Sequence, residues 1–232
     1  VRALSDFINM SSHRRGAKVV LIHPAEALNV NAANALLKSL EELPPRTHFL
    51  LVAHRWHQLL PTVRSRCEQV VLEPPSPEAA QAWLGEQKLR DAGLALAHAG
   101  GAPRLALAYD EDYGQQRQAL LGAITRPDFD ALASAEQLRE TAPRLVLAWL
   151  QKWAFDLVSQ KVAGRVRYNP DYSNAIAATA QRLDLIEAVR FQRRMVRLQR
   201  IITHPLNARL LLEHLLLEYS ALIRHGAVAQ AA

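Results

Sequence analysis

The sequence has few of the residues and segments on which several protein classes depend. Cys67 is its single cysteine, so an internal disulfide and a zinc site built from several cysteines are both excluded. The nine histidines are scattered, and His54 and His57 have no third ligand near them in sequence. No apolar run approaches the roughly 20 residues that span a bilayer, and there is no signal-peptide pattern. We therefore expect a cytoplasmic protein without a metal site.

The composition is that of an ordinary globular protein with a mild excess of positive charge. Half of the 232 residues are hydrophobic and 22% are charged, which allows two or three small packing units. The net charge is +6. This excess is compatible with a nucleic acid or an acidic partner, but it is too small to establish either.

The sequence also lacks the parts of a working nucleotide site. The phosphate-binding pattern Gly-x-x-x-x-Gly-Lys-Ser/Thr does not occur. Residues 18–22 (KVVLI) resemble the strand that ends in two carboxylates in an active ATPase, where one helps to hold Mg²⁺ and the other polarises water. Here His23 and Pro24 take those places, and Glu26 lies beyond the proline on the following loop. We therefore expect this chain not to hydrolyse ATP.

Residues 1–73 alternate between helix and strand patterns. A short helix is expected over Arg2–Met10, and buried strands are expected over 18–22, 48–53 and 69–72. Asn31 is the expected N-cap of a helix that runs to Glu42 and ends before Pro44-Pro45. This alternation predicts a parallel sheet. Because three strands make a thin sheet, we expect the chain to be the C-terminal part of a longer protein.

The proline-rich segment 74–77 marks a boundary, after which only helices are expected. Three short helices are expected within 77–112, and longer amphipathic helices at 114–125, 128–140, 143–162, 171–181, 184–203 and 205–224. The sequence thus predicts an α/β domain over 1–73, a small helical domain over 74–112 and an all-helical domain over 113–232.

Ser65-Arg66-Cys67 lies in the loop between the second and third expected strands, at the rim of the sheet. The fixed fork of donors on Arg66 suits a phosphate. The alternative is that Arg66 forms a salt bridge at the end of the loop, as surface arginines often do.

Three segments with matching spacing carry a family resemblance: KVVLIHPAEALNVNAANALLKSLEELPP, HFLLVAH and LLPTVRSRC. They resemble bacterial clamp-loader subunits of the AAA+ family, most closely the delta-prime type that works with DNA polymerase III. The resemblance is strong over residues 17–72, moderate to about 112 and architectural beyond. It implies the later half of a degenerate AAA+ domain, then a helical lid, then a helical collar that associates with equivalent domains in a ring-like pentamer.

The resemblance also implies a role for the Ser65-Arg66-Cys67 motif. In that family the arginine reaches the phosphates of ATP bound by the neighbouring subunit, so Arg66 would act in trans as an arginine finger and the chain would bind no cofactor of its own. The implied partners are gamma/tau-like and delta-like subunits, the sliding clamp and primed DNA.

Two further family positions fall on this sequence. Gly101-Ala102-Pro103-Arg104 matches the sensor arginine that contacts nucleotide in ATP-binding relatives. Delta-prime-type chains usually leave that role vacant, so Arg104 is either a relic or an intersubunit salt-bridge residue. Val52-Ala53-His54 stands where a threonine is normal, which also argues against hydrolysis.

Several residues are candidates for contact with DNA. The helix N-terminus at Asn31, together with Lys38 and Arg14-Arg15, could hold phosphates, although solvated surface residues are the alternative. On a later helix, arginines share one face and an apolar stripe shares another. These arginines either track phosphates or form a charged outer surface; they are Arg190, Arg193, Arg194, Arg197 and Arg200.

Two rival hypotheses therefore remain open beside the delta-prime-type interpretation. One is an ATP-hydrolysing clamp-loader subunit of the gamma/tau type. The other is a basic DNA-binding module that acts through the Arg190–Arg200 helix.

Overall fold

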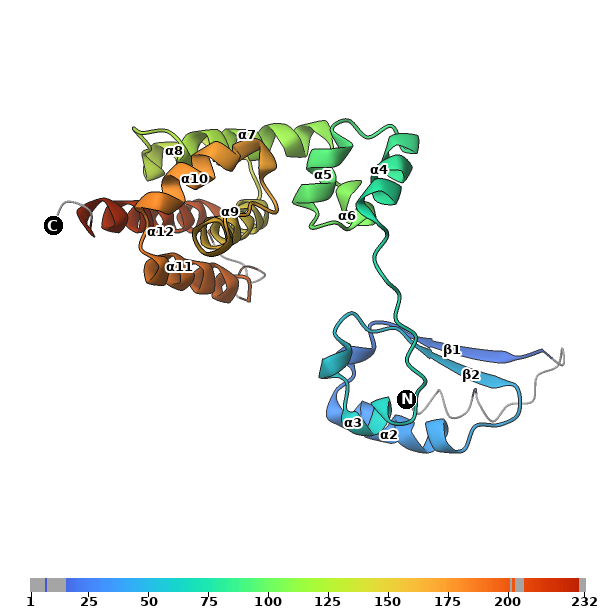
Figure 1. The fold of residues 1–232 in the computed structure, drawn as a ribbon. Helices are drawn as coiled ribbons and strands as arrows, with labels where there is room; N and C mark the ends of the chain where they lie inside the picture. Colours follow the sequence, from blue (N-terminus) through green and yellow to red (C-terminus); the bar gives the residue numbers. More distant parts are fainter. Residues whose placement is uncertain (1–6, 8–15, 201, 203–206, 230–232) are drawn as a thin grey trace. The chain divides into compact units, whose positions relative to one another are not determined.

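The computed structural model describes Phe7, residues 16–200, Ile202 and residues 207–229. The chain divides into two units, residues 1–73 and residues 74–232, which we call the α/β unit and the helical unit (Figure 1). Of the helix expected over Arg2–Met10, all but Phe7 lies outside the described residues, as does Arg14-Arg15.

The α/β unit is built on two parallel strands, β1 (Lys18–Ile22) and β2 (Thr47–Leu51). They pair in register from Lys18 opposite Thr47 to Ile22 opposite Leu51. The sequence prediction of both strands is confirmed, although β2 begins one residue earlier and ends two residues earlier than expected. A helix, α2 (Val30–Glu41), connects them and completes a β-α-β unit.

Helix α2 packs its apolar stripe against one face of the sheet. Leu36 is buried at its centre, and Val63 from a later short helix is buried beside it. The strand residues Ile22 and Phe49 pack against this cluster. The apolar side chains of the other sheet face, Val19, Leu21 and Leu50, are exposed.

The N-cap of α2 is Asn29 and not Asn31, so that prediction is wrong. Asn29 has extended backbone angles, and its side-chain oxygen accepts a hydrogen bond from the Ala32 backbone N–H at 2.8 Å. The helix therefore starts two residues earlier, and Asn31 lies within its first turn. Both asparagines are good capping residues, and the apolar stripe alone does not choose between them.

The third expected strand, 69–72, is also wrong. Residues 68–76 form neither helix nor strand, and Val70, Val71 and Leu72 are between 69% and 87% exposed. A strand needs a hydrogen-bonding neighbour. Within the described residues, the sheet contains only β1 and β2, which pair with each other. Three short elements precede this segment: η1 (Ala25–Ala27), η2 (Trp56–Gln58) and α3 (Pro61–Arg64).

The helical unit confirms the prediction of successive helices, with shifted ends. The described residues after position 73 contain no strand. The elements are α4 (Pro77–Glu86), α5 (Ala92–His98), α6 (Pro103–Ala106), α7 (Glu111–Ile124), α8 (Ala131–Gln137), α9 (Pro143–Ala163), η3 (Pro170–Tyr172), α10 (Ser173–Arg182), α11 (Leu185–Leu198) and α12 (Ala208–Ala229). Among the described helices, none has both the length and the apolar character to cross a membrane.

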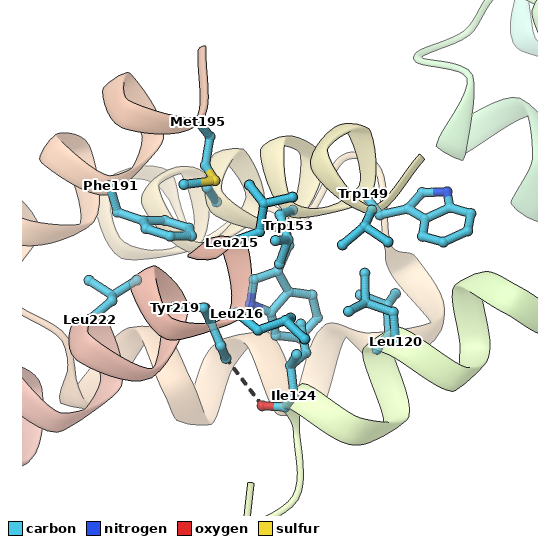
Figure 2. Close-up of a cluster of buried hydrophobic side chains, with 14 of the residues drawn as sticks. Leu120, Ile124, Trp149, Trp153, Phe191, Met195, Leu215, Leu216, Tyr219 and Leu222 are labelled. Carbon is cyan, nitrogen blue, oxygen red and sulfur yellow. Dashed lines mark hydrogen bonds between the residues drawn. The ribbon is translucent and has the colours of Figure 1, made fainter. Parts of the chain in front are cut away.

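Two apolar clusters form the core of the helical unit. A small one joins α4, α5 and α6 around Leu84. A large one gathers side chains from α7 to α12 around Trp149 and Trp153 of α9, which are fully buried (Figure 2). Phe191 and Met195 of α11 point into this cluster, so the apolar stripe of that helix belongs to the core.

Several polar side chains are also buried in the helical unit. The fully buried Arg117 of α7 donates two hydrogen bonds to Asp171, at 2.7 and 2.8 Å, and one to Asn169 at 2.8 Å. Asp156 of α9 is also fully buried and accepts from the backbone N–H groups of Arg167 and Asn169, both at 2.8 Å. These bonds fix the loop between α9 and α10, because a buried polar group is stable only when it is hydrogen-bonded.

Candidate functional site

The candidate site is the turn that follows α3. Pro61 begins this short helix, and Val63 anchors it in the core beneath α2. The chain then continues through tight backbone hydrogen bonds, from Ser65 N to Pro61 O at 2.9 Å and from Arg66 N to Val63 O at 3.1 Å. The backbone of Ser65-Arg66-Cys67 is therefore fixed in a closed, hydrogen-bonded turn.

The guanidinium of Arg66 is held by acceptors from its own chain. Its Nε donates to Glu41 Oε1 at 2.6 Å, and its Nη2 forms an ion pair with the same oxygen. Its Nη1 donates to the backbone oxygen of Thr62 at 2.9 Å and to Ser65 Oγ at 3.3 Å. The side chain remains about one third exposed, so another group can still reach it.

The other two residues of the motif support this turn. The Ser65 hydroxyl donates to Thr62 O at 3.1 Å while it accepts from Arg66. Cys67 is half-buried and packs against the α2 core, where burial raises the pKa of its thiol. A raised pKa disfavours the thiolate, and the side chain packs here as a small apolar group.

A second arginine lies two residues away with a different environment. The guanidinium carbon of Arg64 lies 4.6 Å from the centre of the Trp56 ring, which is a cation–π contact. Arg64 is thus held on an aromatic face, whereas Arg66 is held by a carboxylate. Of the two, Arg66 has the donor fork directed at an anion.

The carboxyl end of β1 has none of the acidic pair of an active ATPase. His23 Nε2 lies 3.0 Å from His54 Nε2, and the two rings meet edge to face. Glu26 accepts from the His54 backbone N–H at 3.3 Å. Backbone N–H groups, first its own and then that of His54, hold the pKa of the Glu26 carboxyl below its usual value. The Glu26 carboxyl is therefore ionised and accepts hydrogen bonds from backbone N–H groups of the loop.

No metal cluster is found in the part of the chain that the structure describes, since no three His, Cys, Asp or Glu side chains gather there. His54, which the sequence placed near His57, contacts His23 instead.

Three other candidates lie on the surface. Asn31 and Lys38 are exposed on α2, and Arg104 is exposed as the second residue of α6, which begins at Pro103. No hydrogen bond or ion pair of the described residues marks any of the three as a binding residue. Their roles stay predictions.

The arginine face of α11 is partly neutralised by carboxylates of the same unit. Arg194 pairs with Glu218 of α12 at 2.6 Å, and Arg190 pairs with Glu187 at 2.5 Å. An open cavity of about 290 Å³ lies beside them and is lined by Arg194, Arg197, Leu198, His214 and Glu218. These pairs favour the interpretation as a charged outer surface over a continuous phosphate strip.

Sequence reasoning missed Glu41, the residue that binds Arg66 most closely. It lies 25 residues earlier in the chain and is the last residue of α2. The sequence did contain a signal for this pair. An acidic residue in the last turn of a helix is destabilised by the negative end of the helix dipole, so a nearby cation is expected.

Comparisons with known proteins agree over most of the chain. Residues 1–76 match the family model described as "DNA polymerase III, delta subunit", and residues 111–221 match "DNA polymerase III, delta subunit, C terminal". The DNA polymerase III subunit delta' of Escherichia coli strain K12 is 32% identical over 98% of this chain and 71% of its own length. The corresponding subunit of Pseudomonas aeruginosa is 35% identical over 68% of this chain, and that match spans about half (51%) of the relative.

Among solved structures, a gamma subunit-related protein of DNA polymerase III from Thermotoga maritima shares the fold. It aligns with a TM-score of 0.50 and 22% identity over 96% of this chain and 78% of that one. This likeness agrees with the arrangement of a parallel β-α-β unit followed by helices. The chain belongs to the family of DNA polymerase III delta-prime subunits.

Proposed function

We propose that the chain works in a clamp loader as a subunit that does not hydrolyse ATP and that supplies Arg66 to ATP bound by a neighbouring subunit. The observation that carries this proposal is the placement of Arg66. It lies on a closed turn after α3. Its side chain is partly exposed, and its donors are directed at the carboxylate of Glu41, as they would be at a phosphate.

The chemistry of a guanidinium supports this role. During phosphoryl transfer, negative charge is spread over the oxygens of the γ-phosphate, and an arginine from an adjacent subunit can stabilise it. Arg66 has the planar fork that this task needs. Arg64 is less suited, because it is already stacked on Trp56.

The end of β1 supports the second half of the proposal. The chain passes directly from Ile22 to His23 and Pro24, and neither side chain can bind Mg²⁺ through a carboxylate. His23 is engaged with His54, and Glu26 with the loop backbone. These contacts support the inference that Arg66 acts on ATP bound by another subunit.

The partners follow from the family. We infer that gamma/tau-like and delta-like subunits assemble with this chain in the cytoplasm, through helices of the region 113–232. We further infer that the assembly loads the sliding clamp onto primed DNA. Arg104, Asn31 and Lys38 remain secondary candidates in this assembly, the first at the sensor position and the others towards DNA.

The test replaces Arg66 with alanine in the reconstituted complex and measures DNA-stimulated ATPase. We expect assembly to persist and turnover at the affected site to fall by about one to three powers of ten. Arg64→Ala is the matched control, since it removes the same charge two residues away, and it should retain most of the activity. Wild-type turnover with Arg66→Ala would show that Arg66 is not the finger.

A further inference from the structure

Glu41 competes with phosphate for Arg66, a role that rests on the proposed function of Arg66. Four contacts hold the Arg66 guanidinium inside its own chain, and they take up most of its five N–H donors. Two of these contacts are made to one carboxylate oxygen of Glu41. A phosphate needs the same donors, so phosphate and Glu41 compete for Arg66.

The place of Glu41 is set by the core and not by a need of its helix. Leu36 and Leu40 of α2 pack with Val63 of α3, so the last turn of α2 is fixed beside the turn that holds Arg66. Glu41 ends that helix. A carboxylate there is repelled by the negative end of the helix dipole, so it destabilises α2 unless a cation neutralises it. Arg66 is that cation.

The strength of the pair suits a contact that forms and opens. The side chains of Arg66 and Glu41 are 34% and 49% exposed. Water can therefore replace either partner, and pairs of this exposure contribute little net stability. Charge still matters to a competing ligand, because a guanidinium that is neutralised by a carboxylate attracts a phosphate less than a free one does.

We propose that Glu41 is a latch that stores Arg66 and releases it to the phosphates of the neighbour's ATP. In the stored state Glu41 satisfies Nε and Nη2, while Thr62 O and Ser65 Oγ hold Nη1. In the released state the Glu41 contacts are exchanged for phosphate oxygens, and the neutral contacts to the turn can persist. Glu41 thus sets how readily Arg66 becomes available to the neighbour's ATP, and Arg66 sets the rate at which that ATP is hydrolysed.

The latch predicts that loss of the Glu41 charge changes the KM for ATP and leaves kcat unchanged. Glu41→Gln removes the charge but keeps the size of the side chain. In the reconstituted complex, we expect the KM for ATP in DNA-stimulated hydrolysis to fall by about two- to fivefold, with kcat unchanged. Glu42→Gln is the matched control, because Glu42 carries the same charge on the adjacent residue and takes no part in the Arg66 contacts. It should leave both constants at the wild-type values.

A double-mutant cycle tests whether Glu41 acts through Arg66. The effect of Glu41→Gln on KM should vanish when Arg66→Ala is present. An effect that persists without Arg66 overturns the latch, as does an unchanged KM. A fall in kcat for Glu41→Gln also overturns it, because Glu41 would then hold Arg66 in its working position. Wild-type turnover with Arg66→Ala alone would instead show that the proposed function itself fails.

Discussion

The two units of the molecule differ in how completely their cores are enclosed. In the helical unit, large side chains such as Trp149 and Trp153 are fully enclosed by neighbouring helices (Figure 2). In the α/β unit, Val19, Leu21 and Leu50 on one face of the sheet are 53%, 63% and 52% exposed. The helical unit thus holds a complete core of its own, whereas the α/β unit buries only the sheet face beneath α2.

The same contrast applies to the arginine–carboxylate pairs. Arg117 is fully buried in the helical unit and pairs with Asp171, whose side chain is 26% exposed, so loss of Asp171 would leave an uncompensated buried charge. Arg66 and Glu41 are partly exposed in the α/β unit, so their contact can be exchanged. The comparison indicates that the first pair maintains structure and that the second is available for function.

The largest expected effect comes from truncation of the large core. Trp153→Ala removes a fully buried ring and should lower the free energy of unfolding of the helical unit by about 3–5 kcal/mol. Urea denaturation followed by circular dichroism measures this loss. Trp83→Ala, at a partly exposed tryptophan of α4, is the control and should cost less. Equal losses for the two variants would contradict the contrast between core and surface.

The next effect concerns the buried Arg117 and its partners. Arg117→Ala leaves Asp171 and Asn169 without their donor and should destabilise the helical unit by about 2–4 kcal/mol. The control is Arg126→Ala, which breaks an exposed pair with Asp128 and should cost about 0.5 kcal/mol or less. The same denaturation experiment compares them, and similar values for both would show that burial does not distinguish these pairs.

A smaller effect should depend on pH. Burial, then the charges of Lys152 and Arg117, lower the pKa of His98 to about 3. The unfolded chain takes up this proton near pH 6.5, so His98 contributes stability that is complete above pH 6.5 and is lost as the pH falls towards 3. The slope is at most about 1.4 kcal/mol per pH unit. His98→Gln should reduce the slope measured by denaturation between pH 6.5 and 5, and an identical slope would refute this assignment.

The sequence predicted what depends on local pattern. Continuous apolar runs identified β1 and β2, and three- to four-residue periodicity identified the helices from α4 to α12. The segment 69–72 has an equally apolar pattern, yet it is exposed and forms no strand. Pattern alone could not predict this, because a strand also depends on a neighbour that lies elsewhere in the chain or beyond it.

The candidate site was predictable in its motif and not in its contacts. Ser65-Arg66-Cys67 could be read directly, whereas its bond to Glu41 depends on how Leu36 and Val63 bring α2 and α3 together. The same reason explains why the buried Arg117 escaped prediction. Its partners Asn169 and Asp171 lie more than 50 residues later in the chain.

The central claim is that Arg66 acts on ATP held by another subunit. Its most direct test is single-turnover hydrolysis of ATP at the site that faces Arg66, in a complex whose other ATP sites are inactivated. With Arg66→Ala, the account predicts ATP binding at that site weakened by only a few-fold and a hydrolysis rate lower by about tenfold to a thousandfold. A wild-type hydrolysis rate at that site would contradict it.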